Sequence, residues 1–128
     1  MKFDCKEIDI SDDEFGCRIT FSDRKEGDHI DNQSYKEIME SIGDYLTLQR
    51  SYPEDEFETD YYIIELSNFD KSGELDDFTI NLSRTQFLMN YKEEIIEIQL
   101  ETNDLIFDKI KEALKKIINE RGQININE

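Results

Sequence analysis

The sequence predicts an α+β domain, in which an antiparallel sheet of about five or six strands carries a C-terminal amphipathic helix on one face. Three observations support this prediction. Short runs of alternating apolar and polar residues recur along the chain, and near residue 104 the alternation gives way to helical spacing. No internal repeat and no linker rich in Pro, Gly or Ser interrupts the 128 residues. We therefore expect one domain, residues 1–128, with a single core.

The strands are predicted where β-branched and aromatic residues alternate with polar ones between polar turns. The predicted strands cover residues 17–21, 45–50, 62–66, 78–82, 87–91 and 96–100. Such a series is typical of an antiparallel meander with one face on the core and the other in water. Because successive side chains of a strand point to opposite faces, either Tyr61 or Tyr62 should be exposed.

A helix is predicted over residues 104–120, because the apolar residues there recur every three or four positions. These residues are Ile106, Phe107, Ile110, Ala113, Leu114, Ile117 and Ile118. Asn103 or Asp104 can cap the first turn, and two lysines near the end suit the negative pole of the helix dipole. Gly122 follows as a stop signal, so residues 121–128 are expected to be a short tail.

A second, shorter helix is predicted over residues 34–42. Four apolar residues of this segment, Tyr35, Ile38, Met39 and Ile42, fall on one side of a helix, and Gly43 ends it.

The net charge is the most informative feature for function. The chain has 32 Asp and Glu against 15 Lys and Arg, which gives a formal net charge of -17. Solubility of a small domain needs a net charge of only about 2–8 in magnitude, and a larger excess adds self-repulsion to the folded state. The excess indicates a partner that is basic, or one that normally binds a polyanion. It disfavours nucleic acid as a ligand, because duplex binding depends on cations that displace counterions.

The residues that carry most enzyme chemistry are sparse. His29 is the only histidine and lies in a polar loop with no nucleophile motif nearby. Phosphate-binding and nucleophile-elbow motifs are absent from the sequence. Cys5 and Cys17 do not have the spacing of a zinc site or of a disulfide scaffold, and we expect both thiols to be reduced, with Cys17 buried on a strand. The sequence therefore predicts no enzyme, no catalytic residue and no cofactor.

The acidic segment that begins at Asp70 starts like an EF-hand calcium loop. Its sixth position is Leu75 where glycine is needed, and its twelfth is Asn81 where a bidentate Glu belongs. We therefore predict no metal site, and interpret the segment as a turn in which Gly73 takes the positive φ. No secretory signal is visible and no apolar run approaches the roughly 20 residues of a membrane span, so a cytoplasmic location is expected.

Two acidic stretches are the candidate partner-binding surface. Residues 54–60 lie between two predicted strands and residues 70–77 lie on the next connection, which is expected at the opposite end of the hairpin. Carboxylates packed this densely repel each other, and a cationic partner relieves that repulsion. Phe57 is suited either to an aromatic anchor at an interface or to a plug at the end of the core. The candidate residues are Glu54, Asp55, Glu56, Phe57, Glu58, Asp60, Asp70, Glu74, Asp76 and Asp77.

The chain resembles the immunity protein 10 family of bacterial polymorphic-toxin systems from residue 45 to residue 118. The matching segments are 45–50 (Tyr-Leu-Thr-Leu-Gln-Arg), 62–65 (Tyr-Ile-Ile-Glu), a turn containing Ser72 and Gly73, and 78–84 (Phe-Thr-Ile-Asn-Leu-Ser-Arg). The resemblance implies a cytosolic antidote that binds a cognate toxin domain, with no catalysis of its own. A basic nuclease-type toxin would suit the acidic surface.

Two other functions remain open from the sequence. The first is an acidic nucleic-acid mimic that inhibits a DNA-binding protein, of the anti-restriction or anti-CRISPR type. It requires carboxylates spaced along one elongated face. The second is a small-ligand or enzymatic domain, which requires a concave pocket that holds a buried acid.

Overall fold

The computed structural model describes residues 1–23, 44–53, 60–67, 73–118 and 121–127. Within these ranges the chain forms ten strands and one helix. They are β1 (Lys2–Asp4), β2 (Glu7–Asp13), β3 (Gly16–Ser22), β4 (Tyr45–Ser51), β5 (Tyr61–Leu66), β6 (Gly73–Glu74), β7 (Phe78–Ser83), β8 (Gln86–Tyr91), β9 (Glu94–Gln99), α2 (Asp104–Ile118) and β10 (Gln123–Asn127). The described residues include no helix that is long and apolar enough to span a membrane.

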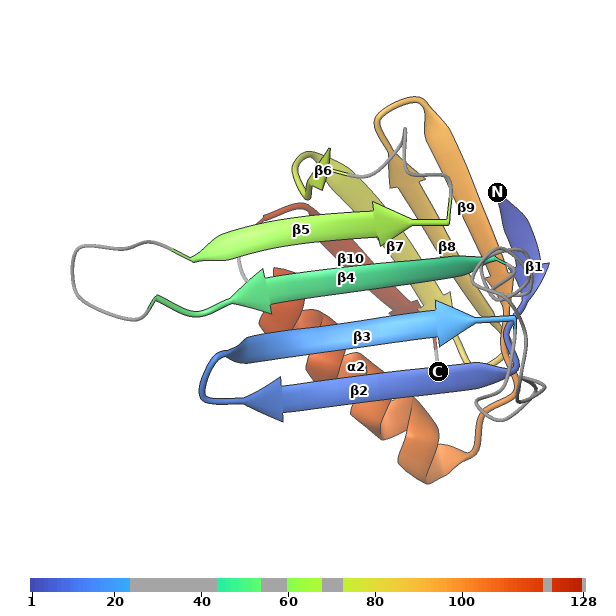
Figure 1. Cartoon of the computed structure of the whole chain (residues 1–128). Helices are drawn as coiled ribbons and strands as arrows, with labels where there is room; N and C mark the ends of the chain where they lie inside the picture. The colour runs from blue at the N-terminus through green and yellow to red at the C-terminus, as the bar shows by residue number, and fades with distance from the viewer. Residues whose placement is uncertain (24–43, 54–59, 68–72, 119–120, 128) are drawn as a thin grey trace, which may run out of the picture.

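The strands form two five-stranded sheets (Figure 1). Sheet A has the order β1-β9-β8-β7-β10, and sheet B has the order β2-β3-β4-β5-β6. Neighbouring strands are antiparallel throughout sheet B and in the β7-β8-β9 centre of sheet A. The two outer strands of sheet A are parallel to their neighbours, β1 to β9 and β10 to β7. The predicted α+β class is confirmed, with the strands divided between two sheets rather than gathered in one.

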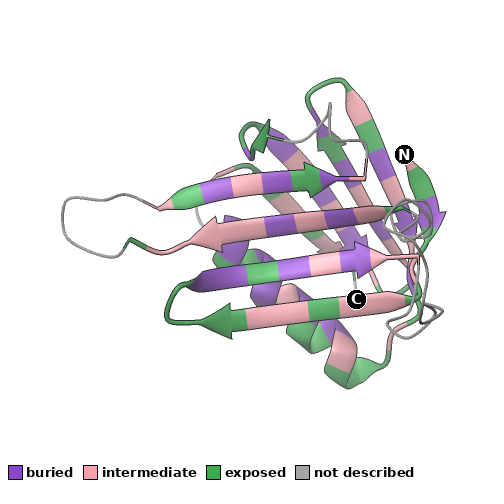
Figure 2. Ribbon diagram, in the orientation of Figure 1, coloured by how far each residue is buried: buried purple, intermediate pink, exposed green. Residues whose placement is uncertain are grey.

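The core lies between the inner face of sheet B and a second layer that sheet A and α2 form together (Figures 1 and 2). Buried and less buried residues alternate along the strands, as the period of two predicts. Phe21 of β3 and Phe87 of β8 are both fully buried, with ring centroids 4.9 Å apart. This aromatic pair joins the two sheets, and α2 covers the part of sheet B formed by β2, β3 and β4.

Helix α2 begins where the sequence predicts. The Asn103 side-chain oxygen accepts a hydrogen bond from the backbone N–H of Ile106 at 2.8 Å, so Asn103 is the N-cap. The apolar stripe of the helix is buried against sheet B and β10, and includes Phe107, Ile110, Ala113, Leu114, Ile117 and Ile118. The described helix ends at Ile118, and the last two residues of the predicted range lie outside the described part of the chain.

All six predicted strands are present, and four further strands were not predicted. Strands β1 and β6 are only three and two residues long, and β2 carries four carboxylates that obscure its alternation. The expected tail at 121–128 instead contains β10, whose Ile residues alternate with Gln and Asn. The helix predicted over residues 34–42 lies outside the described residues.

The positive φ angles lie at positions that differ from the prediction. Among the described residues they occur at Asp77 (48°), Lys92 (54°) and Gly122 (67°), and Gly73 does not have one. Gly73 instead lies in β6, paired with β5, so its backbone is extended. Lys92 makes the tight turn between β8 and β9, where Tyr91 and Glu94 are paired directly.

Candidate functional site

The strand register brings two turns to one end of sheet B. Asp13 is paired with Gly16, Gly16 with Ser51, and Ser51 with Tyr61, so one row of residues crosses four neighbouring strands. The β2–β3 turn, the end of β4 and the start of β5 therefore lie at the same end of the sheet (Figure 1). The backbone N–H of Tyr52 donates to the Phe15 carbonyl at 2.9 Å and ties the turn to the end of β4.

Strand β6 brings a third segment back to the same end. It is antiparallel to β5, with Gly73 paired to Ile64 and Glu74 to Ile63. The backbone N–H of Leu75 then donates to the Tyr62 carbonyl at 3.0 Å. Asp76 and Asp77 consequently follow toward the start of β5, not at the opposite end of the hairpin as the sequence suggested.

We call this region the acidic end of sheet B, and define it by Asp13, Glu14, Phe15, Tyr61, Asp76 and Asp77. All six residues are exposed. The two aromatic residues, Phe15 and Tyr61, are 66% and 65% exposed, whereas the adjacent Tyr62 is 7% exposed. Exposure of one tyrosine of this pair is confirmed. The acidic end thus combines carboxylates with two large aromatic surfaces that the fold does not cover.

The side chain of Asp13 holds the acidic turn between β2 and β3 in place. One carboxylate oxygen of Asp13 accepts the backbone N–H of Phe15 at 2.8 Å and that of Gly16 at 3.2 Å. This arrangement leaves Glu14 and Phe15 projecting at the tip. Gly16 is buried, and a Cβ there would lie 2.4 Å from the Arg50 carbonyl oxygen, so the strands approach too closely for any other residue.

Three arginines near the acidic end have acidic partners. Arg18 lines a hollow together with Asp13 and Phe15, and lies 4.0 Å from Asp9. Arg50 forms an ion pair with Asp60, donates to the Lys116 carbonyl at 2.8 Å, and lies over the rings of two tyrosines. Arg121 pairs with Glu74 at 3.1 Å and lies over a tyrosine ring. By contrast, Glu14, Asp76 and Asp77 have no ion pair within the part of the chain that the structure describes.

The predicted site residues divide into three groups. Asp76 and Asp77 are exposed at the acidic end. Asp60, whose side chain is 22% exposed, and Glu74, at 68%, are held in the ion pairs with Arg50 and Arg121. Glu54, Asp55, Glu56, Phe57, Glu58 and Asp70 lie outside the described residues.

Asp13, Glu14 and Phe15 are functional candidates that were not predicted from the sequence. The segment Asp-Asp-Glu-Phe-Gly at 12–16 has the signature of a turn, with an aspartate that can bond to the backbone and a glycine three residues later. The turn could not be predicted as a hairpin because β2 was not recognised as a strand, and a hairpin needs both of its strands.

Asp12 lies close to the acidic end but has a partner. It forms an ion pair with Lys116, and the hydrogen bond from Lys116 lowers the pKa of the Asp12 carboxyl. Since the pKa is lowered in the folded state, the pair stabilises the fold above the ordinary aspartate pKa, and this contribution is lost as the pH falls through the folded value. The side chain of Asp12 remains about a third exposed, so the effect on stability is small.

We predict that Lys116→Met returns the pKa of Asp12 toward its ordinary value, as followed by NMR titration of the Asp12 carboxyl. Lys115→Met removes the same charge from the neighbouring exposed position and should leave the titration of Asp12 nearly unchanged. Equal shifts in both variants would show that general charge, rather than this ion pair, sets the pKa.

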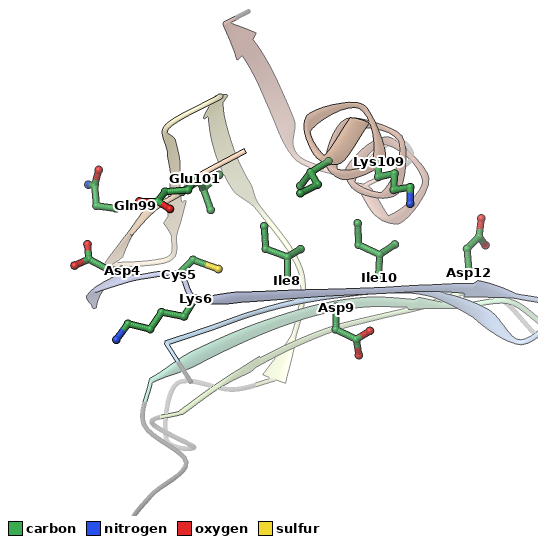
Figure 3. Close-up of a pocket in the computed structure, with 12 residues that line it drawn as sticks. Asp4, Cys5, Lys6, Ile8, Asp9, Ile10, Asp12, Gln99, Glu101 and Lys109 are labelled. Carbon is green, nitrogen blue, oxygen red and sulfur yellow. The ribbon is translucent and has the colours of Figure 1, made fainter. Parts of the chain in front are cut away.

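A groove of ≈ 1330 Å³ lies between β2, α2 and the edge of sheet A (Figure 3). Ile8 and Ile10 point from β2 into the groove, toward α2, whereas Asp9 points away. Ile106 of α2 also lines the groove. Cys5 lies half-buried beside it, and burial raises the pKa of its thiol, which disfavours the reactive thiolate.

The hypotheses of an enzymatic or small-ligand domain and of a nucleic-acid mimic each require a structural feature that can be checked. No polar or charged side chain is buried among the residues that the structure describes, so the groove there holds no buried acid. Exposed carboxylates occur on β2 and β5, in the β8–β9 turn and on α2, and include Asp9, Glu65, Glu93 and Glu112. They are dispersed over several faces, whereas a nucleic-acid mimic needs them along one.

Comparisons of the chain with protein-family models, with curated proteins and with solved structures found no match.

Proposed function

We propose that this protein is an immunity-type inhibitor that binds a basic toxin domain through the acidic end of sheet B. The observation that carries this proposal is the convergence of three separate segments, with exposed carboxylates and two exposed aromatic residues, at one end of one sheet. The resemblance to the immunity protein 10 family supports the choice of a toxin as the partner.

The electrostatics of the acidic end favour a cationic partner. Arg18, Arg50 and Arg121 are paired with Asp9, Asp60 and Glu74, so none of the three forms an ion pair with Glu14, Asp76 or Asp77. Unpaired carboxylates at one end of a sheet raise the energy of the free protein by mutual repulsion, and a basic surface lowers that energy on binding. Such complementarity also speeds the encounter, with association rate constants up to about 10⁸–10⁹ M⁻¹s⁻¹ at low salt.

The two exposed aromatic residues supply apolar contact area, which charged residues alone do not provide at an interface. Phe15 and Tyr61 are large and rigid, and aromatic anchors with a charged surround are typical of interface hot spots. Phe15 stands on a turn that Asp13 fixes through two hydrogen bonds, so little order has to be gained when a partner covers it.

The proposal predicts that reversing two exposed charges slows association. In the double variant Glu14→Lys/Asp76→Lys, the association rate constant should fall by about tenfold at low salt, and its dependence on ionic strength should flatten. The dissociation rate should change less, because charges at the edge of an interface act mainly on the encounter. Stopped-flow or surface-binding kinetics with a basic toxin domain measures both rates.

The matched control is Asp4→Lys/Glu101→Lys, which changes the net charge equally at two exposed positions beside the groove, near the other end of sheet B. It should keep most of the association rate and of its salt dependence. If the association rate constant of the control falls as much as that of the Glu14/Asp76 variant, the partner does not bind at the acidic end. An unchanged rate and salt slope in the Glu14/Asp76 variant would have the same meaning.

A further inference from the structure

Strand β10 is an edge strand that lacks the usual protection. Edges of sheets are normally guarded by charged side chains, by proline or by shortness, because an open edge can pair with another chain. Strand β1 carries Lys2 and Asp4, β2 carries four carboxylates, and β6 is two residues long. Strand β10 has five residues, Gln-Ile-Asn-Ile-Asn, and none of them is charged. Among the four edges that the structure describes, only β10 is unguarded in this way.

The face of sheet A next to this edge is also uncharged. The outward side chains of β10, β7 and β8 are Gln123, Asn125, Asn127, Thr79, Asn81, Ser83, Gln86, Leu88 and Asn90. The Asn125 side-chain amide donates to the Asn81 side-chain oxygen at 3.1 Å, so amides already pair across the two strands. In a chain with 37% charged residues, three adjacent strands thus present a neutral face.

We propose that β10 pairs antiparallel with β10 of a second copy of this chain, around a two-fold axis at Asn125. The pairing would place Asn125 opposite Asn125, Gln123 opposite Asn127, and Ile124 opposite Ile126. Amides then meet amides on the outer face, and isoleucines meet isoleucines on the inner face. The two five-stranded sheets A would become one continuous ten-stranded sheet with an isologous interface.

Charge is the reason that a second copy, rather than a basic partner, fits this edge. Two molecules that each carry a net charge of -17 repel each other wherever acidic surfaces face. The neutral face beside β10 allows them to meet with little direct opposition of like charges. A basic protein would instead be attracted to the acidic end of sheet B, whereas β10 belongs to sheet A.

Repulsion between the two copies also sets the direction in which salt changes dimerisation. Added salt screens the repulsion between the two copies, so dimerisation should strengthen as ionic strength rises. Binding of a cationic partner at the acidic end should weaken under the same change. The dimer and the proposed toxin complex can therefore be tested independently, and either can fail alone. A single strand pair buries less than a standard interface, so we expect a dissociation constant of roughly 10 μM to 1 mM.

The test is sedimentation equilibrium of the purified full chain at concentrations up to about 1 mM, at low and at high salt. Asn125→Lys places two lysines directly opposite each other across the two-fold axis and should raise the dissociation constant about fivefold or more. Asn127→Lys faces Gln123 of the second copy and should raise it about twofold or less. Asn90→Lys has the same net charge but lies on a central strand of the same face, and should leave the dimer intact.

Three results would overturn the proposal. The first is a protein that stays monomeric throughout this range at high salt. The second is an Asn125→Lys variant that dimerises as well as the wild type, which would place the contact elsewhere. The third is an Asn90→Lys variant that loses the dimer as fully as Asn125→Lys, which would indicate stacking of faces rather than pairing of edges. The three substituted side chains are exposed, and circular dichroism checks that each variant is folded.

Discussion

Replacing Gly122 with alanine is expected to destabilise the protein by about 2–5 kcal/mol. Gly122 has a φ of 67°, which costs any residue with a Cβ about 1–2 kcal/mol. A Cβ at this position would also lie 2.6 Å from the ring of Phe78, a buried residue that cannot move without disturbing the core. Overpacking of this kind adds about 1–3 kcal/mol.

Thermal unfolding followed by circular dichroism measures the effect of Gly122→Ala, and we expect Tm to fall by about 10 °C. Gly73→Ala is the matched control, because the nearest atom to a Cβ there is the Tyr91 hydroxyl oxygen at 4.0 Å. Gly73 also lacks a positive φ, so its variant should stay within about 0.5 kcal/mol of the wild type. Equal Tm values for the two variants would contradict the packing of Phe78 against Gly122.

The second large effect is expected from Phe21→Ala, at about 3–5 kcal/mol. Phe21 and Phe87 are both fully buried and in contact, so removal of one ring leaves a cavity between the two sheets. A domain of this size has a total stability of about 5–15 kcal/mol, so the variant loses a large share of it. Chemical denaturation with a fitted midpoint and slope measures the loss.

The control for this prediction makes the same substitution at an exposed ring. Phe15→Ala should change the free energy of unfolding by no more than about 0.5 kcal/mol, because Phe15 is 66% exposed. If Phe15 anchors the proposed partner, the same variant should dissociate from that partner faster. A stability loss of similar size in both variants would show that the turn at Phe15 is part of the core.

The fold was predictable wherever the amphipathic period is strong. The strands with clear alternation and the helix with its Asn103 cap were found, because each of these signals is local. Strand β2 was missed because it is an edge strand, whose Ile8 and Ile10 are only half-buried and are separated by polar residues. Strand β10 was missed because its parallel pairing with β7 depends on residues more than 40 positions away in the sequence.

The candidate site was predictable only in part. The acidic stretches stand out in the sequence, but the register that places Phe15 beside the start of the β4–β5 connection comes from pairing between strands. The two-residue strand β6 reverses the chain and moves Asp76 and Asp77 to the other end of the hairpin. Which acids are neutralised also depends on tertiary contacts, as the pairing of Asp60 with Arg50 shows.

The parallel outer strands of sheet A have a consequence for the order of folding. The β7-β8-β9 meander closes through short turns, whereas β1 must join β9 across more than 90 residues. Contacts between distant parts of a chain form slowly, because their loops lose more entropy on closure. During synthesis β1 leaves the ribosome long before its neighbour exists, and β10 docks only after α2 has been made. The edge that β10 presents therefore forms only after the β7-β8-β9 meander and α2 have been synthesised, so a chain that lacks β10 cannot pair with another chain through this edge.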